Sequence, residues 1–386
     1  MVERKRIALI FKYDENWIGG TYYILNLIKA LNTLSDLQKP EITVCASSLR
    51  DFEYIKLETK YPYLLFYEMN YKKIELSFIK RLANRFIHLL FKKQLYKLKK
   101  NNQLQDKFDL VFPNPNGSFF ELINKEKKVY WIPDFQEDYL PELFPVENIV
   151  YRKQNQISIA LLAKKVIFSS KDAQNDFNRL YPFAVCKQYV LPFAVSHPKY
   201  DKIDIAILKQ KYYIKDNYFY VPNQFWMHKN HKIVIEAVDF LKKKGIEITV
   251  IFSGQENDYR NLAYVNELKK SVEEKSLENC ILFLGFIDRK EQLCLMRNAI
   301  AIIQPSFFEG WSTVIEDAKA MNQFIIASNL KVHKEQLNQN VLFFNPKDVN
   351  SLIELISKAL NEKMEKHDNN YKNNIKLFAE KFIDII

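Results

Sequence analysis

Glycine is scarce in this sequence, with seven glycines among 386 residues. Because so few glycines occur, they are not a general feature of the loops of this chain. Each one therefore indicates a tight turn or a close approach of the backbone. The seven are Gly19, Gly20, Gly117, Gly245, Gly254, Gly285 and Gly310.

Cysteines are few as well, and long apolar runs are missing. The four cysteines have neither metal-site nor disulfide spacing, which favours a reducing compartment. There is no run of about 18 apolar residues, so no segment is expected to span a membrane. The basic start is followed only by a short apolar stretch, residues 7–11, which predicts a first strand and not a secretion signal. We therefore expect a cytoplasmic protein.

The chain is long enough for two domains and apolar enough to give each of them a core. Its 386 residues suit two domains of about 150–200 residues. With 48% apolar and 14% aromatic residues, a disordered chain is excluded.

Short β-rich runs alternate with helical patterns along the whole sequence, which predicts an α/β protein with parallel sheets covered on both faces. We expect two doubly wound, Rossmann-like domains that face one cleft, at residues 1–197 and 217–365. Strands are predicted at residues 6–12, 41–46, 64–67, 110–112, 129–132, 166–169 and 189–193, and then at 218–222, 247–253, 281–285, 299–304, 324–328 and 341–343. Helices are predicted at 231–244 and 349–361, and an amphipathic terminal stretch follows at 371–386.

Positive charge is concentrated in residues 72–100. Ten Lys and Arg residues stand there against Glu75, so this window holds nine of the eleven net positive charges of the chain. Apolar residues recur between the bases at helical spacing. We expect a basic amphipathic helix that binds an anionic membrane surface; the alternative is a solvated helix packed on its own domain. Nucleic-acid binding is not expected, because no nucleic-acid-binding motif is present.

The stretch from Gln304 to Ala320 is the most informative part of the sequence. An apolar run meets a Pro-Ser break, and Glu309-Gly310 follows before a helix start. Thr313 and Glu316 have the Thr-x-x-Glu spacing of a capping box, with Thr313 as the N-cap. Glu309 and Asp317 then flank a helix N-terminus, which attracts anions. Acids beside an anion site suit a ligand with both hydroxyls and phosphates, such as a nucleotide sugar.

This segment resembles the Glu-x7-Glu signature of the retaining glycosyltransferases of family 4, which have the two-domain glycosyltransferase B fold. Counted without a gap, the first acid is Glu309 and the second is Asp317, where relatives usually carry glutamate. The family's Ala-x-Ala-x-Gly-x-Pro continuation departs after Ala320, because Asn322 and Phe324 stand at the glycine and proline positions. The simpler reading is an ordinary strand–loop–helix with acids near a helix dipole.

A second motif, Tyr220 to His231, is similar to the diphosphate-binding turn of the same family. Gln224 and Lys229 have the spacing of the family's arginine or glutamine and its lysine, and Asn223 precedes them. The resemblance implies that Lys229 neutralises the leaving diphosphate without a metal. His228 and His231 are not expected to bind metal, since no third ligand is evident.

The first half adds two loops to the expected cleft. Gly19 and Gly20 follow the first strand and look like the family's first-strand glycine loop. Asp134 and Glu137 follow a later strand; relatives place a histidine at the position of Glu137, and the alternative is a simple loop pair.

The resemblance also assigns smaller pieces of the second half. Gly254 faces the cleft, the backbone of Phe286 and Ile287 contacts the nucleobase, and Glu335 matches a recurrent position of unassigned role. Asp317 or Glu316 holds the ribose hydroxyls, and Glu309 orients the donor sugar. The motif loop and helix start complete the donor site with Gly310, Trp311, Ser312, Thr313 and Val314.

We therefore expect a retaining glycosyltransferase that uses a nucleotide sugar, with no metal or other cofactor, to extend a surface glycan such as a capsule, an O-antigen or a lipid-linked oligosaccharide. The resemblance implies a terminal helix, about residues 366–386, that crosses back to the first domain. Two alternatives are a scaffold that binds nucleotide or glycan without catalysis, suggested by the departures at Gln224, Glu137 and Asp317, and a sugar-nucleotide epimerase on the same fold.

Overall fold

The structure is a computed structural model that describes residues 4–14, 18–69, 107–113, 115, 123–256, 258 and 260–386. The basic segment 72–100, expected to contact membranes, lies outside these residues. By its internal contacts the chain forms two compact units. One contains residues 1–13, 35–130 and 386, and the other contains residues 14–34 and 131–385. The domain division expected from the sequence stays a prediction.

The first unit is built on a parallel sheet of the order β3-β2-β1-β4. Helix α2 (Leu49–Thr59) packs on β2 and β3. It begins because the Ser48 side chain accepts a hydrogen bond from the Asp51 N–H, and it ends at Lys60 in the left-handed conformation. The strands are β1 (Arg6–Ile10), β2 (Glu41–Ala46), β3 (Leu64–Glu68) and β4 (Leu110–Phe112).

A second sheet has the order β5-β6-β7. Its strands are β5 (Val129–Ile132), β6 (Lys165–Phe168) and β7 (Lys187–Val190), with helices α5 (Val146–Leu162) and α6 (Lys171–Leu180) between them. The last strand begins earlier than the predicted 189–193, because Lys187 pairs in register with Lys165.

The third sheet is fully parallel and has the order β10-β9-β8-β11-β12-β13. Alternate residues of its strands point to opposite faces: Phe219 and Val221 belong to one buried core, and Tyr218 and Tyr220 to the other. The strands are β8 (Tyr218–Val221), β9 (Thr249–Phe252), β10 (Ile281–Phe283), β11 (Ile302–Gln304), β12 (Ile325–Ser328) and β13 (Val341–Phe344).

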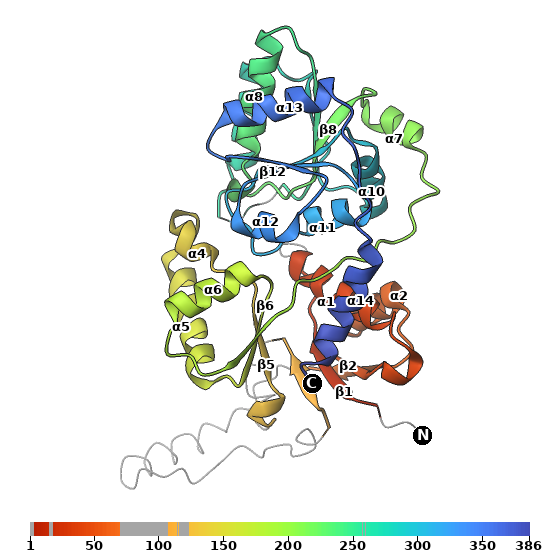
Figure 1. Cartoon of the computed structure of the whole chain (residues 1–386), viewed down its shortest axis with the longest axis vertical. Coiled ribbons are helices and arrows are strands. Elements are labelled where there is room, and N and C mark those ends of the chain that lie inside the picture. Colours follow the sequence, from red (N-terminus) through yellow and green to blue (C-terminus); the bar gives the residue numbers. More distant parts are fainter. Residues whose placement is uncertain are drawn as a thin grey trace, which may run out of the picture. The chain divides into compact units, whose positions relative to one another are not determined.

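Helices cover both faces of this sheet (Figure 1). Helices α8 (His231–Lys243), α9 (Tyr264–Glu274) and α13 (Val349–Asn361) contribute to the core on one face, and α8 and α13 lie side by side. Helices α7 (Ile205–Tyr212), α10 (Arg289–Asn298) and α11 (Thr313–Ala320) contribute to the other core.

The strand order reverses between β8 and β11, which are neighbours in the sheet although strands β9 and β10 lie between them in sequence. In open parallel sheets, ligands bind outside the strand carboxyl ends at such a switch point. The two motifs found in the sequence, Tyr220–His231 and Gln304–Ala320, begin at these two strand ends. The fold therefore brings them together.

The C-terminal helix α14 (Tyr371–Ile383) packs along α1 (Ile18–Leu31), as Figure 1 also shows. Rings of Tyr23 and Phe378 meet edge to face across this contact, 5.8 Å apart. No helix in the part of the chain that the structure describes is long and apolar enough to cross a membrane.

Candidate active site

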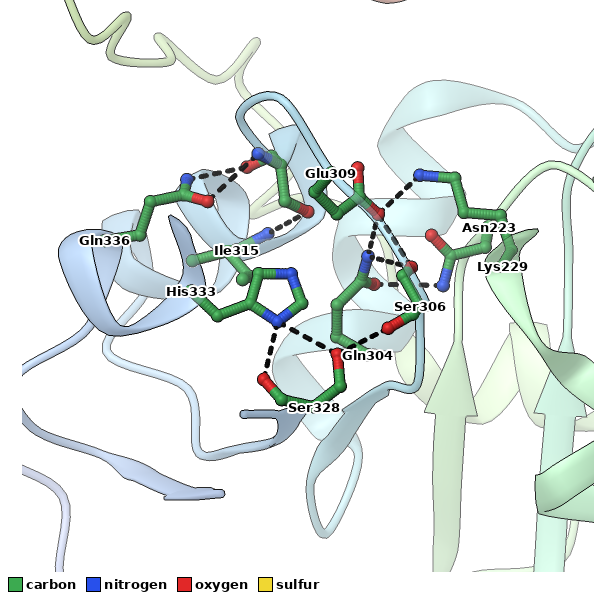
Figure 2. Close-up of polar contacts among 10 residues, drawn as sticks. Asn223, Lys229, Gln304, Ser306, Glu309, Ile315, Ser328, His333 and Gln336 are labelled. Atoms are coloured by element: carbon green, nitrogen blue, oxygen red, sulfur yellow. Dashed lines mark hydrogen bonds and ion pairs between the residues drawn. The ribbon is translucent and has the colours of Figure 1, made fainter. Parts of the chain in front are cut away.

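Glu309 is the centre of a buried polar cluster at the switch point. Its Oε1 accepts hydrogen bonds from Lys229 Nζ at 2.6 Å, Gln304 Nε2 at 2.7 Å and Ser306 Oγ at 2.7 Å. Figure 2 shows these side chains converging on the carboxylate. No described residue donates to the other oxygen, Oε2. One carboxylate oxygen is therefore fixed by the protein, and the other is available to a ligand.

The two strand ends are joined directly at this point. Asn223, two residues after β8, donates through Nδ2 to Gln304 Oε1 at 2.9 Å. Lys229 ends a short 3-10 turn, Met227–Lys229, and is followed by Asn230 in the left-handed conformation. Asn230 donates to the carbonyls of Pro305 and Pro346, at 3.2 and 3.0 Å. These contacts hold the Lys229 turn on the Glu309 loop.

Glu309 is charged although it is buried. Burial by itself would raise the pKa of its carboxyl, but the nearby Lys229 ammonium and the hydrogen bonds from Lys229 and Ser306 outweigh it, so the pKa is lowered. The Lys229 and Glu309 side chains are 14% and 8% exposed. The site thus holds a nearly desolvated ion pair.

The start of α11 differs from the predicted capping box. Ser312, not Thr313, is the N-cap, and its side chain accepts from the Ile315 N–H at 3.4 Å. Glu316 does not reach back to the cap. The Ser312 N–H is instead taken by Gln336 Oε1 at 3.0 Å, and the N–H groups of Thr313 and Val314 have no acceptor among the described residues.

The two acids of α11 are both buried and engaged. Glu316 accepts from Lys319 and Gln336, each at 3.0 Å, and from the Tyr371 hydroxyl at 2.5 Å. Gln336 and Tyr371 come from other elements, which explains why the local capping pattern failed. Asp317 Oδ1 accepts from Arg289 Nη2 at 2.5 Å and pairs with His197 Nε2 at 3.0 Å.

Gly310 brings the loop after β5 against the motif. A Cβ built on Gly310 would lie 2.8 Å from both Pro133 O and Asp134 Cβ. Asp134 therefore adjoins the motif, and burial raises the pKa of its carboxyl. Glu137, in contrast, is 2% exposed and has both oxygens engaged, by Arg152 Nη1 at 2.9 Å and Gln156 Nε2 at 2.5 Å.

Gly310→Ala is expected to lower the free energy of unfolding by about 1–3 kcal/mol, because backbone must move to admit the methyl group. Gly19→Ala is the matched control: its Cβ would meet nothing within 4 Å in α1, so it should be neutral or stabilising by up to about 1 kcal/mol. Urea titration measures both. Equal stability of Gly310→Ala and the parent would contradict the close approach.

The predicted nucleotide loops lie side by side. Phe225 N–H donates to Gln255 O at 3.0 Å, and Gly254 N–H to Gly285 O at 2.9 Å. A Cβ on Gly254 would lie 2.2 Å from Asn223 O, so this position requires glycine. The loop that contains Gln224 is therefore hydrogen-bonded to Gln255, and the neighbouring Gly254 is hydrogen-bonded to Gly285. Phe286, the next residue, is exposed.

Other residues predicted from the sequence lie within helices or make hydrogen bonds between elements. Gly19 and Gly20 lie in the first turn of α1 and not in the loop before it. Trp311 donates through Nε1 to Phe193 O at 3.1 Å. Glu335, from helix α12 (Lys331–Gln336), accepts from the N–H groups of Lys171 and Asp172 at 2.7 and 3.2 Å and so caps α6.

His333 was not identified from the sequence. Its ring is fully buried, and Nδ1 lies 2.8 Å from Ser328 O, so Nδ1 carries the proton and donates. The opposite nitrogen, Nε2, has no partner among the described residues and lies on the side of the ring away from Ser328 (Figure 2). Burial lowers the pKa of His333 to about 4, so Nε2 is an acceptor. Only tertiary contacts reveal this.

The missing family glycine has a structural replacement. Asn322, at that position, has φ of +53° just after α11. Asparagine is the residue that best replaces glycine in the left-handed conformation at a helix end. This departure from the family pattern therefore leaves the helix end intact.

Among the residues that the structure describes, no group of three or more His, Cys, Asp and Glu side chains could hold a metal ion. His231 is instead stacked on Phe225, with ring centroids 4.7 Å apart.

Several solved glycosyltransferases have the same fold as this chain. A glycosyltransferase from Rickettsia africae ESF-5 superposes with a TM-score of 0.66 and 16% identity, and Anabaena HepE, solved with UDP and glucose, with 0.66 and 17%. Each match covers 99% of this chain and 96% of the other. The chain has the glycosyltransferase B fold predicted from its sequence.

Residues 204–378 match the model of the family of glycosyl transferases group 1. Among curated proteins, the O-antigen chain mannosyltransferase RfbU of Salmonella typhimurium is 25% identical over 224 residues, 57% of each chain. Protein CapJ of Staphylococcus aureus is 29% identical over 154 residues, 40% of this chain and 37% of CapJ. The chain thus aligns with little more than half, or less, of these relatives' lengths.

Proposed function

We propose that this protein is a retaining glycosyltransferase that transfers a sugar from a nucleoside-diphosphate sugar to the acceptor of a surface glycan. The observation that carries the proposal is the buried Lys229–Glu309 pair at the switch point of the six-stranded sheet.

The diphosphate end of the site is formed by Lys229 and the start of α11. The N–H groups of Thr313 and Val314 have no acceptor in the described structure, and the helix dipole adds partial positive charge there. An ammonium and two open N–H groups are suited to a departing diphosphate. Gln224 would add a neutral contact from the same turn as Lys229.

The sugar end is formed by Glu309. Because Oε1 already accepts from three side chains, Oε2 is the atom that can accept from a donor-sugar hydroxyl. Asp134, beside Gly310, borders this end, whereas Glu137 acts through Arg152 and Gln156 as part of the supporting structure.

In the proposed reaction the bond between the anomeric carbon and the diphosphate oxygen breaks, and a bond to the acceptor oxygen forms on the same face. The proton of the acceptor hydroxyl passes to the departing phosphate oxygen. No separate base or metal is then required, because Lys229 and α11 stabilise the negative charge that develops.

The substrate class is inferred from the relatives, whose names include O-antigen mannosyltransferases. The donor would carry UDP or GDP, with the nucleobase at the Phe286–Ile287 loop. Residues 1–197 would bind the acceptor, and the basic segment 72–100 would hold the protein on the cytoplasmic face of an anionic membrane. A non-catalytic scaffold gains no support, since the Lys229–Glu309 pair is complete and Asn322 replaces the lost glycine.

A thermal-shift panel of UDP-, GDP- and other sugar nucleotides tests the proposal. A ligand that binds only the folded state at a concentration 100-fold above its Kd stabilises it by about 2.7 kcal/mol. We expect one donor to raise Tm clearly and a chelator to leave that shift unchanged. No response to any donor would contradict the proposal.

A further inference from the structure

Helix α5 exposes a largely apolar face to solvent. Its inner side is closed by Gln156, Ile159 and Ala160, which are buried. A surface helix ordinarily carries polar and charged residues on its outer side. Here six large apolar side chains on the outer side are 42–71% exposed: Val146, Val150, Tyr151, Ile157, Leu161 and Leu162. An exposed apolar patch of this extent indicates an interaction surface.

The exposed positions of this face have a symmetrical spacing. Six of them are separated by three, four, three, four and three residues: Glu147, Val150, Gln154, Ile157, Leu161 and, just beyond the helix end, Lys164. Alternating intervals of three and four form one stripe along a helix, the pattern with which two helices pack side by side. Because the intervals read the same in both directions, the stripe matches a second copy of itself that runs antiparallel. Val150 would then lie opposite Leu161 of the second copy.

The two ends of α5 carry opposite charges. Glu147 lies in its first turn, whereas the exposed Lys164 and Lys187 lie beyond its last turn. These two bases are neighbours, because the Lys187 N–H donates to Lys164 O at 2.9 Å. An antiparallel second copy brings the acid of each helix to the bases of the other, whereas a parallel copy sets like charges together. The charges therefore favour the same orientation as the spacing.

An anionic membrane surface fits this face less well. Helices that lie on anionic lipid are rich in lysine and arginine on their polar side. Within α5 the bases are Arg152 and Lys153, and they are bound to Glu137 and Asp138, which precede the helix. The charge in the first turn, Glu147, is acidic. An apolar centre with charged residues only at its rim is instead typical of contacts between proteins.

We propose that α5 is a self-association surface, on which a second copy of this chain docks its own α5 antiparallel, with the two-fold axis between Gln154 and Ile157. Such a contact uses the same surface on both copies and is therefore complete with two chains. This inference goes beyond the proposed function and does not depend on it.

Sedimentation velocity tests the association. One helix from each copy makes a small contact, so we expect a micromolar Kd, and the measured mass should rise from 46.0 kDa toward twice that value between about 1 and 200 μM protein. Ile157→Glu places two carboxylates beside the two-fold axis and should weaken association by at least about a hundredfold. Because Ile157 is 42% exposed, this variant should fold like the parent. Ile207→Glu is the matched control, since Ile207 is 63% exposed on α7, and it should leave the Kd unchanged.

Disulfide trapping tests the orientation. The four native cysteines are buried, so a cysteine introduced on α5 is the exposed one. A mixture of the Val150→Cys and Leu161→Cys proteins should form a cross-linked heterodimer under oxidation. Either protein alone should not, because in the antiparallel pair the two copies of each residue lie about 16 Å apart along the helix axis, too far for a disulfide.

The outcomes decide the inference without affecting the proposed function. A parent protein that stays monomeric over the whole range, an unchanged Kd in Ile157→Glu, or cross-linking by Val150→Cys alone would overturn it. So would a monomer that sediments with phosphatidylglycerol vesicles and loses this in Ile157→Glu, because the face would then bind lipid. Donor binding in the thermal-shift panel should be the same in Ile157→Glu as in the parent, so either result here leaves the transferase proposal to its own test.

Discussion

Lys229→Ala is expected to lower turnover by about a hundredfold to a thousandfold, the usual effect of removing one preorganised group that stabilises a leaving oxyanion. Its Nζ lies 2.6 Å from Glu309 Oε1, at the end of the site proposed for the diphosphate. Without it, the diphosphate would depart next to a buried carboxylate with no counter-charge. The assay is release of nucleoside diphosphate from the donor found in the thermal-shift panel.

The two members of the pair should fail in different ways. Lys229→Ala removes a phosphate contact, so nucleotide affinity should fall together with turnover. Glu309→Gln keeps the shape of the side chain and touches the sugar end only, so UDP or GDP should bind nearly as before while turnover falls. The double variant should cost less than the product of the two single effects, because the two side chains are hydrogen-bonded to each other and their substitutions are not independent.

Stability must be followed in parallel, since either substitution leaves a buried group without its partner. A loss of about 1–3 kcal/mol is expected, which a folded protein can tolerate at assay temperature. Lys243→Ala is the control, because its pair with Asp239 is formed by a lysine that is 73% exposed. Near-normal turnover in Lys229→Ala or Glu309→Gln would refute the assignment.

Most of the fold was predictable because the local signals agree with the tertiary structure. Apolar runs bounded by polar turns marked β8 to β13 within a few residues, and the two motifs were placed correctly at adjoining strand ends. Glu309 and Lys229, 80 residues apart, were expected to share one site, and the structure joins them by a hydrogen bond.

What failed depended on partners that are distant in sequence. Thr313 and Glu316 have the pattern of a capping box, but Tyr371, 55 residues away, takes the Glu316 carboxylate and leaves the cap to Ser312. The contacts of Glu137 with Arg152 and Gln156 could not be foreseen either, and its place in the site stays a prediction. No local pattern announces such contacts, because long side chains are satisfied by whatever the fold brings near them.

The burial of three histidines could not be predicted for the same reason, because it depends on residues that are distant in sequence. From the sequence, His228 and His231 were only a doubtful metal pair, and His333 went unnoticed. In the structure all three are buried, and burial lowers the pKa of each: to about 3 for His231, to about 4 for His333, and well below the ordinary value for His228.

We expect acid to destabilise this protein steeply between about pH 6.5 and pH 4. In the unfolded chain these histidines take up protons near pH 6.5. In the folded protein His231 and His333 stay neutral down to about pH 4, and the pKa of His228 is also well below its ordinary value. The unfolded state therefore binds more protons in this window, and the free energy of unfolding falls as the pH is lowered. Three protons correspond to a slope of about 4 kcal/mol per pH unit.

The buried carboxylates change the free energy of unfolding either in the opposite direction to the histidines or only at lower pH. The lowered pKa values of Glu309 and Asp317 add stability that is lost only below the ordinary carboxyl range, about pH 4. Asp134, whose pKa burial raises, gains a proton earlier in the folded state and so offsets part of the loss. The slope just below pH 6.5 therefore reports the histidines.

One substitution separates this mechanism from general acid unfolding. The His231 ring is stacked on Phe225 at 4.7 Å, with an angle of 17° between the planes, and meets Phe252 edge to face. A phenyl ring can fill the same space, so His231→Phe should remove about one third of the slope while changing stability little at pH 7.5. His367→Gln, at an exposed position, should leave the slope unchanged. The slope is measured by urea titrations from pH 7.5 to 4.5. If His231→Phe kept the full slope, the buried neutral His231 would not be a cause of it, because a phenylalanine binds no proton in the unfolded chain and so cannot contribute to the pH dependence.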